Sequence, residues 1–68
     1  MMYRFLFTGA AGEGFSHCEH RRYPSDADAI IAGRHRLNSR PLANRVDIFR
    51  MASGDTWGVM SHVVSYTK

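Results

Sequence analysis

The chain has 68 residues, a formal net charge of +3 and 44% hydrophobic residues. A chain of this length buries only about 60% of the surface that it exposes when unfolded, so we assign residues 1–68 to a single small domain. No apolar run reaches the roughly 20 residues of a membrane span, and no secretory cleavage pattern follows the start. Cys18 is the only cysteine, which excludes an intramolecular disulfide and suits a reducing compartment. These features predict a cytoplasmic protein that does not bind membranes.

Two strands are predicted before residue 24. The first, Met2–Thr8, carries two sets of alternating side chains, Tyr3, Phe5 and Phe7 against Met2, Arg4 and Leu6. Its aromatic face is expected to meet a helix. Residues 9–14 contain three glycines and are expected to form a loop between antiparallel strands. The second strand, Phe15–Tyr23, is more polar, which suits the edge of a sheet.

The clearest helix signal lies between Pro24 and Arg40. Ser25 is expected to cap this helix by accepting from the amide of Asp28, whose carboxylate reaches back to the amide of Ser25. Acidic residues begin the helix and basic residues end it, as the helix dipole favours, and Pro41 stops it. The stripe expected on the sheet consists of Ile30, Gly33 and Leu37, flanked by Ala27 and Ala29. The residues expected to face away are Asp28, Ala32, His35 and Arg36.

Two further strands are predicted after the helix. The first, Arg45–Met51, places Val46 and Ile48 on one face and Asp47, Phe49 and Met51 on the other. Ser53–Asp55 is predicted to form a tight turn. Thr56–Tyr66 is the last predicted strand, again with two sets of side chains, Trp57, Val59 and Val63 against Met60, His62, Val64 and Tyr66.

This order of elements predicts an α+β fold, a four-stranded, mostly antiparallel sheet (ββαββ) with one helix packed on one face. One helix covers only one side of such a sheet. Leu6, Phe49 and Met60 have the parity of the uncovered side, and an exposed apolar patch of this kind marks a surface for a partner. A homodimer is one way to cover it.

Three patterns that would carry chemistry are weak. His17, Cys18, Glu19 and His20 resemble metal ligands, but alternation along a strand puts only two of them on each face, whereas zinc takes three or four protein ligands. The glycine-rich loop lacks the spacing and the following helix of a phosphate-binding loop. Cys18 and His20 point the same way rather than toward each other, so they do not form a nucleophile and base. We expect no enzyme activity, no cofactor and no metal.

A resemblance extends over most of the chain. The polar strand, the Ser-capped helix beginning Ser25-Asp26-Ala27-Asp28-Ala29 and the strands around Gly54-Asp55-Thr56-Trp57 resemble the layout of very small phage and mobile-element proteins. In length and element order the chain is similar to some anti-CRISPR inhibitors. The resemblance implies a non-enzymatic blocker that occupies a surface of an RNA-guided surveillance complex, for example on CRISPR effector subunits. The basic balance argues against an acidic DNA mimic and favours acidic protein surfaces, or nucleic acid held by the complex.

The expected function is therefore a non-enzymatic binding module that docks on a protein or nucleoprotein target, most concretely as an anti-CRISPR-type inhibitor. The alternative is a small basic nucleic-acid-binding protein, because arginine pairs with phosphates and aromatic side chains stack on bases. The residues expected to contact a partner are Arg21, Arg22, Arg34, Arg36, Arg50 and Trp57.

Overall fold

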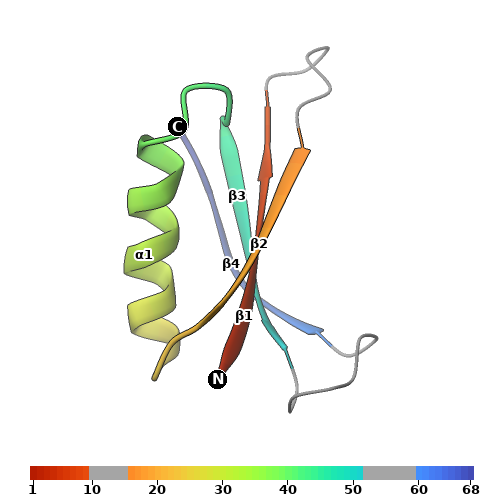
Figure 1. Ribbon diagram of the computed structural model, residues 1–68, viewed down its shortest axis with the longest axis vertical. Coiled ribbons are helices and arrows are strands. Elements are labelled where there is room, and N and C mark those ends of the chain that lie inside the picture. Colours follow the sequence, from red (N-terminus) through yellow and green to blue (C-terminus); the bar gives the residue numbers. More distant parts are fainter. Residues whose placement is uncertain (10–15, 52–59) are drawn as a thin grey trace.

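The computed structural model of the chain describes residues 1–9, 16–51 and 60–68. Its elements follow in the order β1 (Met2–Thr8), β2 (Ser16–Arg22), α1 (Asp26–Asn38), β3 (Arg45–Met51) and β4 (Met60–Thr67). Figure 1 shows the four strands in one sheet with α1 beside it. This is the predicted α+β fold. The predicted loop at 10–14, the turn at Ser53–Asp55 and the expected partner contact Trp57 lie outside the described residues.

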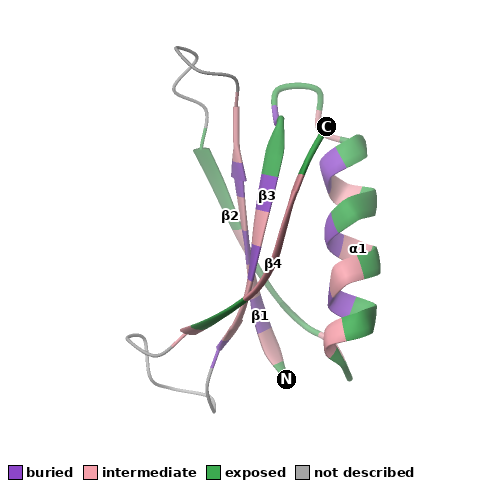
Figure 2. Cartoon of the chain, turned by 180° about the vertical axis from the view of Figure 1, so that it is seen from behind, coloured by how far each residue is buried: buried purple, intermediate pink, exposed green. Residues whose placement is uncertain are grey.

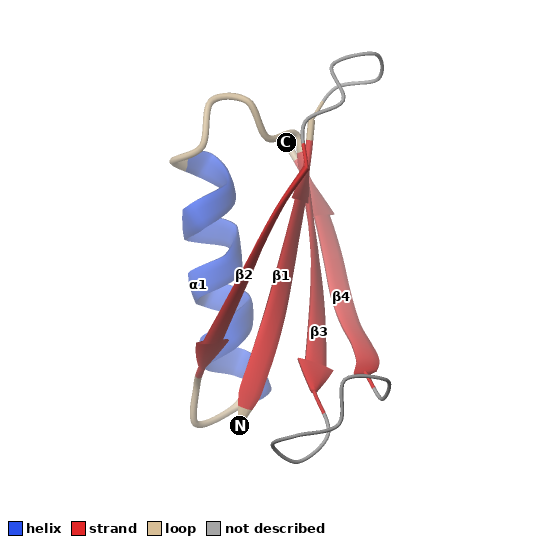
Figure 3. Cartoon of the chain, turned by 45° about the vertical axis from the view of Figure 1, so that its right-hand side comes forward, coloured by secondary structure: helices blue, strands red, loops and turns tan. Residues whose placement is uncertain are grey.

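The sheet has the strand order β2-β1-β3-β4, and every neighbouring pair is antiparallel. β2 and β4 are therefore its edges, as the polar composition of β2 predicted. Since both β2 and β3 run opposite to β1, they run parallel to each other, and α1 forms the crossover connection that parallel strands require. Figure 3 shows this helix on one face of the sheet. Within the described part of the chain, no helix has the length and apolar character needed to cross a membrane.

The hydrophobic core lies between the sheet and α1. Its buried members are the three aromatic residues of β1 and aliphatic residues of the helix, the connector and β3: Tyr3, Phe5, Phe7, Ala29, Leu37, Ala43, Val46 and Ile48. Buried residues line β1, β3 and the inner side of the helix in Figure 2. Burial of a large apolar side chain stabilises a fold by about 1.5–3 kcal/mol, so β1 and β3 supply most of the stabilising contacts.

The ends of α1 form largely as predicted. The amide of Asp28 donates to Ser25 Oγ at 3.3 Å, and Ser39 is the C-cap. The Asp28 carboxylate accepts from the Ser25 hydroxyl at 3.2 Å, where a bond to the Ser25 amide was predicted. At the same end, Asp26 joins the helix to the sheet, because its carboxylate accepts from the Tyr3 hydroxyl and from Arg50 Nη1 at 2.6 Å.

The buried stripe of α1 differs from the predicted one. It follows i, i+4 spacing through Ala29, Gly33 and Leu37, which turns the helix so that Ala27 is exposed and Ala32 packs against the core. Ile30, expected in the stripe, is only half-buried. Arg36 was expected to face away but is half-buried as well. The rotation brings two small residues, Ala29 and Gly33, to the buried side of the helix.

β4 also departs from a single alternating pattern. Val64 pairs with Ile48, whereas His62 pairs with Phe49, so the register shifts by one residue at Val63. Such a bulge lets both Val63 and Val64 pack against the core. Val64 and Tyr66 therefore share the face of the helix, while Met60 and His62 lie on the opposite face. The prediction that these four residues share one face is wrong, because simple alternation takes no account of an inserted residue.

At Gly33 the helix α1 approaches the sheet closely. A Cβ atom at this position would lie 2.5 Å from Ile48 Cδ1 and 3.2 Å from Ile48 Cγ1. Ile48 is fully buried, so the methyl group has little room to move. Overpacking of this kind costs about 1–3 kcal/mol, which outweighs the roughly 1 kcal/mol that alanine gains over glycine inside a helix.

We predict that Gly33→Ala lowers the free energy of unfolding by about 1 kcal/mol, measured by urea denaturation. Ile48→Val removes Cδ1, so Gly33→Ala in that background should be neutral or stabilising. This double-mutant cycle separates the steric clash from helix propensity. A single Gly33→Ala variant more stable than the parent chain would show that the core yields at this position.

Candidate functional site

The face of the sheet turned away from α1 has no element packed on it among the described residues. We call it the open face, and strand register assigns to it Met2, Arg4, Leu6, Thr8, Ser16, Cys18, His20, Arg22, Arg45, Asp47, Phe49, Met51, Met60, His62, Ser65 and Thr67. Leu6, Phe49 and Met60 are half-buried and lie on this face, as their parity predicted. The open face is thus a mixed surface, in which apolar side chains surround charged ones.

Arg4 lies near the middle of the open face, on the central strand β1. Its Nη2 contacts Cys18 Sγ at 3.2 Å and its Nη1 contacts Met60 Sδ at 3.8 Å, and sulfur is a weak acceptor. Its Nε is buried and has no hydrogen-bond partner within the described part of the chain. A buried, incompletely paired guanidinium is costly. Arg4 is therefore a strong donor that the fold itself does not satisfy.

The carboxylate on the open face is already engaged. Asp47 accepts from Arg45 Nη2 at 2.9 Å and from Arg45 Nε at 3.1 Å, and it also accepts from the Ser65 hydroxyl. The hydrogen bond from Arg45 is the main cause that lowers the pKa of Asp47, and the bond from Ser65 acts in the same direction. The same pair raises the pKa of Arg45. Asp47 is thus held as a carboxylate.

His62 extends this network, with Nε2 2.7 Å from Ser65 Oγ. Because the Ser65 hydroxyl donates its proton to Asp47, the imidazole is the donor in the contact with Ser65. In a hydrolase triad the imidazole stands between carboxylate and hydroxyl and takes the hydroxyl proton. Here serine stands in the middle, so the order is not that of an activated nucleophile. The network links β3 to β4.

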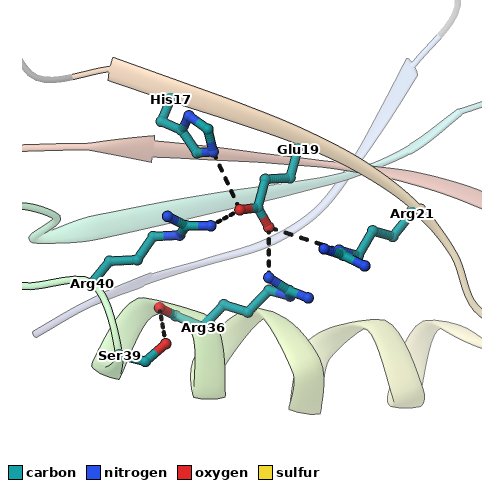
Figure 4. Close-up of polar contacts among 6 residues, drawn as sticks. All are labelled: His17, Glu19, Arg21, Arg36, Ser39 and Arg40. Carbon is teal, nitrogen blue, oxygen red and sulfur yellow. Dashed lines mark hydrogen bonds and ion pairs between the residues drawn. The ribbon is translucent and has the colours of Figure 1, made fainter.

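A second polar group lies on the other side of β2, toward the helix. We call it the arginine cluster: the guanidinium groups of Arg21, Arg36 and Arg40 around the carboxylate of Glu19 (Figure 4). Arg36 Nη1 donates to Glu19 Oε1 at 3.0 Å, Arg40 forms an ion pair with Oε2, and Arg21 Nε lies 3.9 Å from Oε1. His17 Nε2 is 3.2 Å from Oε2. The cluster ties the edge strand to the end of α1.

The structure separates the five described residues of the six expected to contact a partner. Arg21 and Arg36 meet at Glu19, whereas Arg22 belongs to the open face. The guanidinium of Arg34 lies 4.9 Å above the Tyr66 ring, and Arg50 pairs with Asp26 at the start of the helix. They therefore form no single patch.

Sequence reasoning missed Arg4, Glu19 and Arg40. Glu19 shares the parity of His17 and Arg21, which was a usable signal, but its meeting with Arg40 depends on the strand order. For Arg4 the signal was its place between apolar residues on the parity opposite the aromatic face. The same alternation separates His17 and Glu19 from Cys18 and His20, as predicted. Among the described residues, no group of three or more potential ligands is placed to hold a metal ion.

The chain matches no protein-family model, and neither the curated proteins nor the solved structures gave a match. The open face and the arginine cluster are therefore the features of the chain that indicate a function.

The lowered pKa of Asp47 predicts a pH dependence of stability. The folded-state pKa lies below the unfolded value of about 3.9, so the stabilisation is complete above that value and is lost as the pH falls through the folded-state pKa. Asp47→Asn should lower the free energy of unfolding at pH 7 by about 1–2 kcal/mol. It should also flatten the decrease in Tm between about pH 5 and pH 2.

Thermal melts of the parent chain and the variant across this range check the prediction. Asp28→Asn, which removes an exposed carboxylate from the helix, is the matched control and should leave most of the decrease in place. The pKa of Asp26 is also lowered, mainly by the Tyr3 hydrogen bond and further by Arg50. Asp26 therefore accounts for part of the decrease in Tm that remains at low pH in Asp47→Asn. An unchanged acid slope in Asp47→Asn would contradict the assignment.

Proposed function

We propose that the chain is a non-enzymatic binding module whose open face docks on an acidic surface of a target protein. The observation that carries this proposal is the guanidinium of Arg4 in the middle of that face, whose Nη1 and Nη2 contact only the weak sulfur acceptors of Met60 and Cys18 among the described residues. A carboxylate of a partner would supply the strong acceptor that the sulfur contacts do not. The apolar neighbours of Arg4 would exclude water from the pair, which strengthens it.

The charge of the open face favours an acidic partner over a second copy of the chain. Its described cations are Arg4, Arg22 and Arg45, and its described anion is Asp47, which Arg45 and Ser65 already bind. Two such faces pressed together would bring like charges into contact, which is unfavourable. An acidic surface would instead complement the face and steer association.

The size of the face sets the expected strength of binding. Three strands of seven residues and one of eight span roughly 19 Å by 23 Å, which is about half of the 800 Å² that one partner buries in a standard interface. Such a small contact depends on a few strong interactions, and Arg4 is the best placed. The resemblance in layout suggests one concrete target, the protein subunits of an RNA-guided surveillance complex, with inhibition by occupation of their surface.

Site-specific cross-linking tests the proposal. In a Cys18→Ser background, Ser16→Cys places a thiol on the open face, since Ser16 pairs with Thr8 on β1. A thiol-directed photo-cross-linker at this position should capture, from nuclease-treated host lysate, a defined protein through an acidic segment. Adding Arg4→Gln should lower the yield about tenfold, because a charge-assisted hydrogen bond is lost. CRISPR effector subunits among the products would support the inhibitor version.

Two controls keep the result specific. Arg34→Gln removes the same charge from the exposed Arg34 side chain, which lies beside Tyr66 on the helix side of the sheet, and should leave the yield unchanged. Arg34→Cys moves the cross-linker away from the open face. Products that persist with Arg4→Gln, or that join through a basic segment, would overturn the docking site. If all retained material disappears with nuclease, the alternative of nucleic-acid binding prevails. A product joining two copies of the chain would point to a homodimer.

A further inference from the structure

The arginine cluster carries more positive charge than its fold requires. Three guanidinium groups converge on one carboxylate, that of Glu19, whose side chain is only 11% exposed. One negative charge therefore faces three positive ones, and a net charge of +2 remains. Lys68 adds to it, because its Nζ donates to the main-chain carbonyl of Arg40 at 2.7 Å. Side chains needed only to fasten β2 to the helix could do so with one arginine.

The donors of the cluster are also incompletely used. A guanidinium has five N–H groups. Arg36 uses one of them, because its Nη1 donates to Glu19 Oε1 at 3.0 Å. Arg21 Nε lies 3.9 Å from the same oxygen, which is too far for a hydrogen bond. Arg40 Nε is buried and finds no acceptor within the described residues. The Arg40 guanidinium is held above the Phe7 ring, 5.1 Å from its centroid. The cluster is thus preorganised, with donors left over.

The packing of the helix leaves the cluster accessible. α1 contacts β1, β3 and β4 but not β2 among the described residues, so only the side chains of Arg36 and Arg40 bridge to the edge strand. Figure 4 shows these side chains and Arg21 approaching Glu19 from different directions. The Arg21 side chain is 49% exposed. A small ligand can therefore reach the Arg21 guanidinium directly, and the Arg36 and Arg40 side chains, 28% and 31% exposed, are partly open to it.

We propose that Arg21, Arg36 and Arg40 form a binding site for a doubly charged phosphate group, either a phosphate ion or a phosphate monoester. The net charge of +2 matches such a dianion, whereas a single carboxylate would leave one positive charge unpaired. Guanidinium forks bind phosphate oxygens in a bidentate manner. Glu19 acts as an internal counterion that holds the arginines together and competes with the ligand. This site lies on the helix side of the sheet and is independent of docking through the open face.

NMR titration with inorganic phosphate tests the site, at pH 8 and at constant ionic strength kept with chloride. Saturable shifts are expected at the amides of Glu19, Arg36 and Arg40. Arg36→Gln should weaken binding about tenfold, since it removes a charge-assisted donor. Arg34→Gln, the matched control on the same helix, should change it less than about twofold. Glu19→Gln should tighten binding about fivefold because it removes the internal competitor.

Arg21→Gln supplies a second variant if Glu19→Gln fails to fold, because Arg21 is exposed and outside the core. Like Arg36→Gln, Arg21→Gln should weaken phosphate binding several-fold. A phosphate monoester can come from a phosphorylated protein or from a nucleotide. O-phosphoserine represents the first source and a nucleoside 5′-monophosphate the second, and the compound that binds with the higher affinity identifies the source. A dinucleoside monophosphate, which carries one negative charge, should bind more weakly than either. Shifts that do not saturate, equal losses in Arg36→Gln and Arg34→Gln, or a preference for the diester would overturn the proposal.

Discussion

One short helix must cover a sheet that is wider than itself. A helix with its side chains is about 10–12 Å across, whereas four strands spaced about 4.8 Å apart are roughly 19 Å wide. α1 therefore packs over β1, β3 and β4 and leaves the helix side of β2 uncovered. The opposite face has no described layer over it at all. The arginine cluster follows from this mismatch, because it lies on the helix side of the strand that α1 does not reach. The open face is uncovered because the one helix of the described residues packs on the other side of the sheet.

The chain treats its two uncovered regions differently. On the helix side of β2, long arginine side chains reach across the gap and converge on Glu19, so charge replaces apolar packing. On the open face, Asp47 is satisfied within its own network while Arg4 is not. Natural folds pair nearly all buried polar atoms. An arginine left incompletely paired is therefore a better indication of binding than exposure alone.

Local patterns in the sequence predicted the fold well and the sites poorly. Alternation in β1 and β3, the Ser25 cap and the polar edge strand depend on neighbours in sequence, and all were predicted correctly. The bulge at Val63 and the rotation of α1 toward Ala29 depend on contacts between distant segments, which no local period encodes. The meeting of Glu19 with Arg36 and Arg40 likewise requires the strand order. Alternation correctly predicted the face on which Arg4 lies. Its lack of a strong acceptor could not be predicted, because it depends on which side chains from β2 and β4 surround it in the folded sheet.

The bulge in β4 has a consequence for how the sheet meets other molecules. An open sheet can grow by adding a strand at either edge, which is a common route to aggregation and to peptide capture. At one edge β2 presents charged side chains, and at the other the shift at Val63 interrupts the ladder of backbone groups that an incoming strand would need. Charge at one edge and the bulge at the other thus disfavour strand addition. A partner is left with the faces, where side chains rather than backbone groups decide what is recognised.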